Sequence, residues 1–417
     1  MEFKTKKNCR FCKSKNLKKV IDFGLMPLAG GFLKKEEIKK ERKYPLRVFV
    51  CENCGLVQSV DVISAELLFK DYRYASSTTK TLREHFKKYA KEMAARFLKQ
   101  DSFIVEIGSN DGVFLAPLKK FRINALGVDP ATNIVKIAKK RGLNVINDFF
   151  NIKTAKLILK KYGKTDAIFA NNVLPHIDDI DETMKGIKLL LNKKGILVFE
   201  VQYLADLVKY IQYDFIYHEH LCYFSLKPLI KFLDKYEMKI FDVKRVPTQG
   251  GSIRVYAINK STPLNRAGQK YQASKRFLEM LKLEKKMGLY AYEGLKIFTK
   301  KIIKHKIGLI KILKKFKAES KTISGYGASG RSATLTNYCG IGKNYLEYMI
   351  DASPERYGRL MPGTHVKIMP PSYLRKNPTD VILITAWNFK NEILKKEKWF
   401  LKQGGKVIIP LPKITIL

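Results

Sequence analysis

The chain has 417 residues and carries 80 Lys and Arg against 38 Asp and Glu, a formal net charge of +42. That length suits two to three domains, and 46% hydrophobic residues are enough for ordinary cores. No apolar run reaches the roughly 18 residues of a membrane span, and no apolar segment follows the polar start. We therefore expect no membrane contact and a cytoplasmic location.

The basic charge is spread over nearly every helix and loop, which favours a compositional bias over one binding tract. An anionic partner is the alternative, either a phosphorylated small molecule or nucleic acid.

Four of the six cysteines form two Cys-x-x-Cys pairs, Cys9 with Cys12 and Cys51 with Cys54. In a reducing compartment such pairs favour metal over disulfides. Four thiolates can close a tetrahedral Zn²⁺ site with no open position, so we expect structural zinc rather than a catalyst. A redox dithiol is the alternative, although nothing nearby suggests a thioredoxin-like βαβ unit. Residues 1–75 are thus predicted to be a zinc module with a loop inserted around Met26–Gly31.

From residue 101 strand and helix patterns alternate with short connections, as in a doubly wound α/β sheet. Five parallel-type units followed by two consecutive strands fit a seven-stranded, Rossmann-like methyltransferase sheet better than a six-stranded dinucleotide sheet. The predicted strands are 103–108, 125–129, 144–147, 166–170, 195–201, 238–246 and 252–259.

The first of these strands runs into a glycine-rich turn that opens a helix, a place where backbone N–H groups can approach a ligand. The turn carries Glu106, Gly108, Asn110 and Gly112, and Asn tolerates positive φ better than most residues. Asp129 ends the next strand, where an acid can bind ribose hydroxyls. We expect nucleoside binding here, and a tight packing turn is the alternative.

Other polar side chains follow the later strands, and ligands of open α/β sheets lie outside these carboxyl ends. Asp148 and Phe149 suit an adenine edge and face, and Asn171 and Asn172 follow the fourth strand. The remaining candidates near these ends are His176, Tyr217, Glu219 and His220.

Methyl transfer from S-adenosylmethionine to carbon requires a base for a proton beside a carbonyl and donors for the enolate oxygen. His220 and His176 with Tyr217 and Glu219 could supply both. Taken singly, each histidine would more often be a packing or capping residue, and Cys222 is expected to be structural. Hydride transfer to a nicotinamide is a weaker alternative, because the glycine spacing differs from the dinucleotide pattern.

The last part of the chain, residues 263–417, is predicted to hold two amphipathic helices up to about residue 318 and a second α/β unit. Its strands are expected near 346–350, 380–385 and 406–410. The pattern Gly325-x-Gly-x-x-Gly330 resembles a phosphate-binding turn, and Arg331 offers a fork-shaped anion contact. A packing turn is again the alternative.

The chain resembles the nucleotide-sugar C-methyltransferases, which act on 4-keto deoxysugar nucleotides, nearly from end to end. The matching segments are Pro27–Ala29, Tyr44–Leu46, Cys51–Gln58, Tyr72–Tyr74, Glu106–Gly112, Asn172–His176, Tyr217–Ser225, Gly250–Arg254, Gly325–Ala328 and Ala386–Asn388. The resemblance implies three parts: a zinc module (1–75), an S-adenosylmethionine domain (76–262) and a nucleotide-sugar domain (263–417).

The resemblance also implies roles for single residues. His220 would remove the proton at carbon 3 of the sugar, His176, Tyr217 and Glu219 would orient the sugar or serve the oxyanion, and Tyr72 and Tyr74 would close over it. The implied substrate-binding residues are Gly251, Ser252, Arg254, Gly325, Tyr326, Gly327, Ala328, Ser329, Arg331 and Asn388.

Two residues depart from the family pattern, and the second, Gln249, leaves the identity of the sugar open, though not the reaction class. Gly30 stands where the family often has Asn, and Gln249 stands where His is common. Two other functions stay open as well: a methyltransferase of this architecture with another small-molecule acceptor, and, less favoured, a protein that binds or modifies nucleic acid. We expect a monomer or homodimer.

Overall fold

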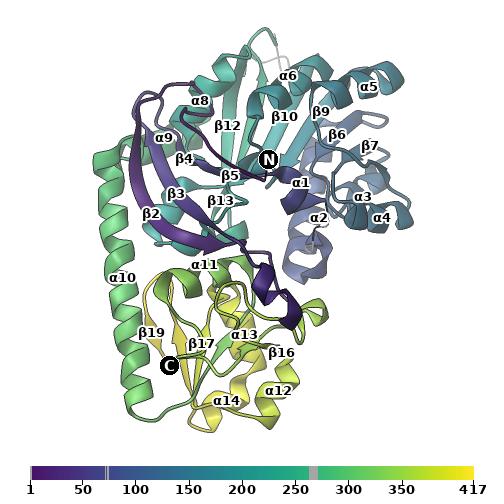
Figure 1. Ribbon diagram of the computed structural model, residues 1–417. Coiled ribbons are helices and arrows are strands. Elements are labelled where there is room, and N and C mark those ends of the chain that lie inside the picture. The colour runs from purple at the N-terminus through teal and green to yellow at the C-terminus, as the bar shows by residue number, and fades with distance from the viewer. Residues whose placement is uncertain (1, 71, 73–74, 263–270) are drawn as a thin grey trace.

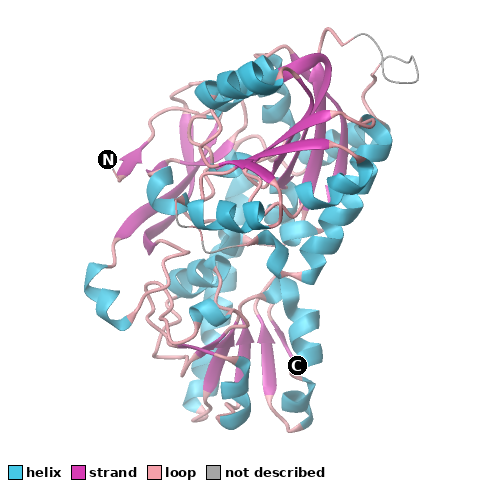
Figure 2. Cartoon of the chain, turned by 90° about the vertical axis from the view of Figure 1, so that its right-hand side faces the viewer, coloured by secondary structure: helices cyan, strands magenta, loops and turns pink. Residues whose placement is uncertain are grey.

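The computed structural model describes residues 2–70, 72, 75–262 and 271–417. The described residues form a two-stranded and a four-stranded sheet in the N-terminal part, a seven-stranded middle sheet and a six-stranded C-terminal sheet. Figures 1 and 2 show the middle and C-terminal sheets one above the other. The long helix α10 (Tyr292–Ala318) runs beside the N-terminal sheet and the C-terminal sheet (Figure 1). No helix among the described residues is both long and apolar enough to cross a bilayer.

The N-terminal module is built on a long antiparallel hairpin of β2 and β3, where the sequence suggested an inserted loop. Its sheet has the order β11-β4-β3-β2, so the middle domain supplies one edge strand. The strands of the module, the added strand and the short helix are β1 (Phe3–Thr5), β2 (Leu17–Pro27), β3 (Lys43–Cys51), β4 (Val57–Ser59), β5 (Asp61–Ile63), β11 (Cys222–Tyr223) and α1 (Ala65–Phe69).

The middle sheet has seven strands in the order β12-β13-β10-β9-β6-β7-β8, which confirms the predicted seven-stranded sheet. Only β13 runs antiparallel to its neighbours, since it follows β12 directly through a tight turn. The strands are β6 (Phe103–Ile107), β7 (Asn124–Val128), β8 (Asn144–Ile146), β9 (Thr165–Asn171), β10 (Leu191–Gln202), β12 (Met238–Val246) and β13 (Ser252–Asn259).

Helices cover both faces of this sheet, so the central strands are apolar on both sides. One face packs on α2 (Lys80–Phe97), α3 (Leu115–Leu118) and α4 (Thr132–Lys140). The other packs on α5 (Ile152–Tyr162) and α6 (Ile180–Leu190). The carboxyl ends of β6 to β10 are left as the edge where loops can build a site.

Two helices link this domain to the last one, as the sequence predicted: α9 (Lys275–Lys286) and α10. Within α10, His305 is buried and contacts the Tyr213 hydroxyl at 3.0 Å and the Pro410 carbonyl at 2.7 Å. The helix therefore ties the middle domain to the end of the chain. Two further helices of the middle domain are α7 (Leu204–Lys209) and α8 (Leu226–Asp234).

The C-terminal sheet has the order β16-β15-β14-β17-β18-β19 and is parallel except at β19. Its strands are β14 (Ile323–Tyr326), β15 (Met349–Ile350), β16 (Ile368–Met369), β17 (Val381–Ile384), β18 (Lys406–Ile409) and β19 (Thr415–Ile416). Its helices are α11 (Gly330–Cys339), α12 (Pro371–Lys376), α13 (Lys390–Lys396) and α14 (Lys398–Lys402). Helix α11 lies at the end of this domain that faces the rest of the chain (Figure 1), and Thr334 of α11 donates to the Ile216 carbonyl of the middle domain.

Candidate functional site

The four paired cysteines come together as predicted. The ligand atoms of Cys9, Cys12, Cys51 and Cys54 all lie within 4.8 Å of one another. The Cys9 and Cys54 sulfurs lie 3.5 Å apart, and the Cys12 and Cys51 sulfurs lie at the same distance. Each of these contacts joins one Cys-x-x-Cys pair to the other. Four such thiols fit one tetrahedral Zn²⁺ with no open position, which makes the metal structural.

The loop after β6 has the backbone that its sequence predicted. Gly108, Asn110 and Gly112 have φ values of +66°, +49° and +78°, so Asn110 takes the left-handed conformation that glycine would otherwise supply. The Asp129 carboxylate accepts the Asn110 N–H at 2.8 Å and the Ala131 N–H at 2.9 Å. Asp129 therefore shapes the loop from the end of β7.

Buried polar atoms around this loop are left ready for a ligand. Among the described residues, Glu106 Oε2, Ser109 Oγ, Asp111 Oδ1 and Asn171 Oδ1 are buried without a hydrogen-bond partner. Burial raises the pKa of Glu106 well above its ordinary value, and the charges of Asp129 and Asp111 raise it further. Orphaned acceptors and crowded carboxylates favour a ligand with cationic groups, so this cradle fits the sulfonium and ammonium of S-adenosylmethionine.

The other predicted cofactor residues lie along the same edge of the sheet. Asp148 and Phe149 follow β8, with Asp148 exposed and Phe149 half-buried. Asn171 ends β9 and donates to Glu106 Oε1 at 2.9 Å. Asn172 has φ +56°, and its N–H donates to the Glu200 carbonyl at 2.8 Å. Their roles toward an adenine ring stay predictions.

A Gly108→Ala substitution is expected to damage this cradle. The added Cβ would lie 2.7 Å from Cγ2 of Val173, in a backbone conformation that alanine disfavours. Overpacking of this kind costs about 1–3 kcal/mol beyond the backbone strain. Gly24→Ala is the matched control, because Gly24 has φ +75° and nothing within 4 Å of its added Cβ.

Thermal unfolding and calorimetric titration with S-adenosylmethionine measure the two variants. We expect the Gly108 variant to lose both more stability and more affinity than the control. Equal affinity in both variants would mean that the loop does not hold the ligand.

The Tyr217–His220 segment is held over the sheet edge by the zinc module. Directly after it, β11 pairs with β4, and the Ser59 N–H donates to the Leu221 carbonyl at 3.0 Å. Arg10, in the first zinc knuckle, is fully buried and donates to the same Leu221 carbonyl at 3.4 Å. On the other side the Leu221 N–H donates to Pro175, next to His176, at 2.7 Å.

His220 sits in a defined orientation and tautomer. Its Nδ1 lies 2.6 Å from the Phe215 carbonyl, which can only accept, so Nδ1 carries the proton and Nε2 the lone pair. The ring stacks on Phe215 at 4.1 Å and lies 4.0 Å from the Tyr217 ring. Burial lowers the pKa of His220 well below its ordinary value, so the imidazole is neutral at pH 7.

The other predicted members of the set surround this ring. His176 lies 5.0 Å from His220, its Nδ1 contacts the Glu219 carbonyl at 2.7 Å, and burial lowers its pKa to about 4. Burial raises the pKa of Glu219 to about 7 and keeps the Tyr217 hydroxyl protonated. The Tyr72 hydroxyl donates to Glu219 at 3.4 Å. Tyr74 lies outside the described residues.

All three parts of the chain meet at this cluster. A Cβ added to Gly30 of the zinc module would lie 3.3 Å from Oε1 of Glu219. A Cβ added to Gly330, at the start of α11, would lie 3.7 Å from Cζ of Tyr217. The half-buried Tyr217 and Glu219 side chains thus stand between the zinc module and the C-terminal domain.

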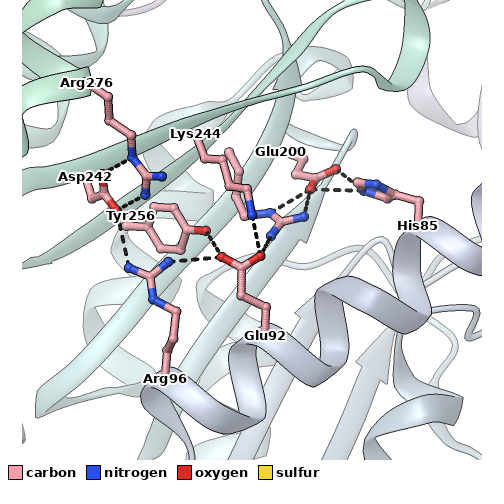
Figure 3. Close-up of polar contacts among 9 residues, drawn as sticks. His85, Glu92, Arg96, Glu200, Asp242, Lys244, Tyr256 and Arg276 are labelled. Carbon is pink, nitrogen blue, oxygen red and sulfur yellow. Dashed lines mark hydrogen bonds and ion pairs between the residues drawn. The ribbon is translucent and has the colours of Figure 1, made fainter.

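The predicted substrate residues Gly251, Ser252 and Arg254 make contacts inside the middle domain, and their binding of substrate stays a prediction. Gly251 packs on Asp206, and the fully buried Ser252 donates to the Thr248 carbonyl at 3.0 Å. Arg254 is 2% exposed and belongs to the ionic network between α2 and the sheet that Figure 3 shows. Its donors reach Glu200 at 2.7 Å and Glu92 at 3.0 Å, so a buried charge requirement explains this arginine.

Most of the predicted phosphate loop is packed inside the C-terminal domain, and its binding of phosphate stays a prediction. Added Cβ atoms at Gly325 and Gly327 would meet Met349 at 2.6 Å and Ala386 at 2.2 Å, so these glycines serve packing. Tyr326 donates to Glu397 at 2.9 Å inside the domain, and Ala328 N–H to Asp351 at 2.7 Å.

Arg331 does not present a free fork, because its Nε and Nη2 bind the Asp214 carboxylate at 2.7 and 3.1 Å. The Ser329 side chain accepts from the Ser332 N–H at 3.3 Å at the start of α11. Of the predicted set, Asn388 is exposed, Ser329 and Gly251 are half-buried, and the others are buried.

Several residues with roles at the site escaped the sequence analysis. Asp111 binds the backbone N–H of Ser77 at 3.2 Å and so draws the segment before α2 onto the loop. The Phe215 carbonyl accepts the proton of His220 Nδ1, and the neighbouring Asp214 binds Arg331 of α11. Only Asp111 had a local signal, as an acid inside the glycine turn. The other two act through partners that are distant in the sequence.

Three family models match successive stretches of the chain. They describe a zinc binding domain over residues 9–69, a methyltransferase domain over 79–241 and a C-methyltransferase C-terminal domain over 247–412. The order of the three matches is the order of the N-terminal, middle and C-terminal sheets along the chain.

Similarity to known proteins spans nearly the whole chain in one case and less than half of it in others. C-methyltransferase NovU of Streptomyces niveus is 31% identical over 411 residues, which are 98% of this chain and 96% of NovU. A SAM-dependent methyltransferase from Archaeoglobus fulgidus is 21% identical with a TM-score of 0.34, over 39% of this chain and 71% of that one. Magnesium protoporphyrin IX methyltransferase from Synechocystis PCC 6803 is 13% identical with a TM-score of 0.36, over 45% and 90%. These two overlaps are too weak to add to the assignment. From the match with NovU, the cysteine cluster and the methyltransferase domain, the chain belongs to the C-methyltransferase family, with S-adenosylmethionine as methyl donor and a structural zinc module.

Proposed function

We propose that this enzyme methylates the carbon beside the ketone of a nucleotide-linked 4-keto deoxysugar, with His220 as the base. The membership of the C-methyltransferase family supports carbon as the acceptor. The resemblance of the Tyr217–His220 segment to nucleotide-sugar C-methyltransferases supports the substrate class.

One observation carries the proposal: the hydrogen bond between His220 Nδ1 and the Phe215 carbonyl, 2.6 Å long. It fixes the tautomer whose Nε2 can accept a proton, and burial keeps that nitrogen unprotonated. The adjacent His218 shows the opposite arrangement, since its Nε2 contacts the Pro45 carbonyl at 3.1 Å. His218 therefore has its lone pair on the buried Nδ1. His220 has its lone pair on Nε2 and its ring lies beside Tyr217 and His176, so we assign the base to His220.

The chemistry divides among the chain's own residues as follows. His220 Nε2 takes the proton from the carbon next to the ketone, and the electron pair of that C–H bond moves toward the carbonyl oxygen. The protonated Tyr217 hydroxyl donates to this oxygen as its negative charge develops, which lowers the barrier. S-adenosylmethionine supplies a methyl group on a positively charged sulfur. His176 and Glu219 orient the sugar ring beside Tyr72.

The nucleotide end of the substrate is assigned to the start of α11. Ser329 and Asn388 stay at the surface there, and Gly330 adjoins Tyr217. Arg331 is left out of this assignment because Asp214 holds its guanidinium. The helix N-terminus favours an anionic diphosphate even without a free arginine.

A panel of nucleotide-linked keto sugars, incubated with isotope-labelled S-adenosylmethionine, tests the proposal. Mass spectrometry of the mixture should find one labelled methyl on one of the keto sugars, and NMR should place it on carbon 3. Label on oxygen or nitrogen, or label on a non-sugar acceptor only, would overturn it.

A further inference from the structure

Asp214 is a buried acid with three donors, all from the C-terminal domain. Its carboxylate is fully buried in the loop Tyr213–Tyr217. It accepts from Arg331 Nε at 2.7 Å, from Arg331 Nη2 at 3.1 Å and from Trp387 Nε1 at 2.9 Å. A planar two-bond contact of this kind fixes direction as well as distance. These contacts thus fix the position and orientation of α11 relative to the middle domain at this loop.

Helix α11 makes a second contact with this loop, at the residue that follows Phe215. The Thr334 hydroxyl donates to the Ile216 carbonyl at 3.1 Å. Arg331 and Thr334 lie one turn apart on α11, so they bracket Phe215 from one rigid element. The Arg331 guanidinium also lies 5.4 Å from the Phe215 ring and 4.8 Å from the Trp387 ring.

Phe215 in turn makes two contacts with His220. Its carbonyl accepts the Nδ1 proton at 2.6 Å, and its ring stacks on the imidazole at 4.1 Å with an interplanar angle of 19°. Any rotation or shift of Phe215 would therefore move the imidazole or release its proton. A continuous path of contacts leads from α11 through Asp214 and Phe215 to His220.

We propose that Asp214 and Arg331 are positioning residues for the base: through Phe215 they hold His220 in its proton-accepting orientation when α11 is docked. The inference rests on the proposed function, since it concerns the same histidine. It assigns to Arg331 a task different from the phosphate contact that its sequence suggests.

The charges of Asp214 and Arg331 act on the pKa of His220, so removing either charge should change the pH profile. Burial is the main cause that lowers the pKa of His220, and the charges of His176 and Arg331 lower it further. The titratable and charged groups that act on the ring are His176 from the loop after β9, Tyr217 from its own segment, and Arg331 from α11. Asp214 stands behind Arg331 and partly offsets its charge.

Four variants test the proposal in the full-length protein. Asp214→Asn and Arg331→Gln each remove one charge, and the double variant removes both without leaving a lone buried ion. Glu41→Gln is the matched control, because Glu41 also joins two parts of the chain, accepting from His365 at 2.8 Å and Gly363 at 2.6 Å, away from the loop. Each is measured for kcat, KM, melting temperature and pH profile.

In the double variant we expect kcat to fall about a hundredfold with KM unchanged, since small misplacement of a base has effects of that size. The acid limb of the profile should move up in Arg331→Gln and down in Asp214→Asn, because the two charges act on the imidazole in opposite directions. The Glu41 variant should keep the wild-type kcat and acid limb. A change in KM with kcat unchanged, or an acid limb of the pH profile that does not move, would overturn the positioning role.

Nitrogen-15 NMR of the imidazole rings gives a readout independent of turnover. The chain has six histidines, so the His220 signal can be assigned by its loss in His220→Asn. Wild type should show protonated Nδ1 and bare Nε2, and the double variant a mixture of tautomers. An unchanged His220 signal in a folded double variant contradicts the positioning role. If wild type methylates no keto sugar while its His220 signal depends on the pair, the proposed function alone fails.

Discussion

His220→Ala is expected to lose methyl transfer by about 10²–10⁴-fold, the usual contribution of a positioned base. The loss should fall on the chemical step, because the ring lies outside the cradle of Glu106 and Asn171 and leaves binding of the methyl donor intact. Transfer of labelled methyl in a single turnover measures the step, and calorimetric titration measures the donor's affinity.

His365→Ala is the matched control for this variant. His365 of the C-terminal domain contacts Glu41 of the zinc module at 2.8 Å, outside the His220 cluster, so its loss should leave the chemical step unchanged. Burial holds the pKa of His220 below 6.5, so this imidazole is already neutral above pH 6.5. The wild-type rate should therefore show no titration of His220 above that pH. A His220 variant with the wild-type rate would remove the base from the account.

The zinc module gives the second large effect. Cys54→Ser, or extraction of the metal by a chelator, is expected to unfold the module, because binding of structural zinc contributes about 10–16 kcal/mol. That is as large as the roughly 5–15 kcal/mol by which whole domains are stable. Activity should fail with it, since β4 and Arg10 hold the Leu221 carbonyl next to His220. Metal content, melting temperature and methyl transfer are measured together.

Cys339→Ser provides the comparison for the zinc variant. Cys339 is a buried thiol outside the metal cluster, and a serine there can keep the 3.3 Å contact with the Tyr213 hydroxyl. We expect this variant to retain its metal and most of its rate. If the Cys54 variant lost zinc and still turned over at the wild-type rate, the module would have no part in holding the base.

The fold was largely predictable because its signals are local. The strands β6 to β10 are short apolar runs that end in polar or glycine turns, and two adjacent strands after them indicated the tail of the seven-stranded sheet. The pairing of β11 with β4 could not be predicted: β11 has two residues, and its partner lies in the zinc module. The β2–β3 hairpin was missed because its strands are interrupted by charged, outward-facing residues.

At the candidate site, the residue types indicated the chemistry well, but they did not indicate which side chains would be in contact. Tyr217, Glu219, His176 and His220 do meet, since their loops leave neighbouring strand ends. The arginines show where sequence reasoning stops. Arg254 and Arg331 both follow glycine-rich turns, and such a guanidinium looks the same whether it meets a phosphate or a buried carboxylate. Their acidic partners, Glu200 and Asp214, lie far away in the chain.

Hydrogen exchange at the carbon beside the ketone tests the central claim most directly. The nucleotide sugar is incubated in heavy water with enzyme and S-adenosylhomocysteine, so that deprotonation proceeds without methyl transfer. We predict that the proton signal of carbon 3 disappears with wild type and persists with His220→Ala. Exchange that is equally fast with both proteins would contradict the assignment of His220 as the base.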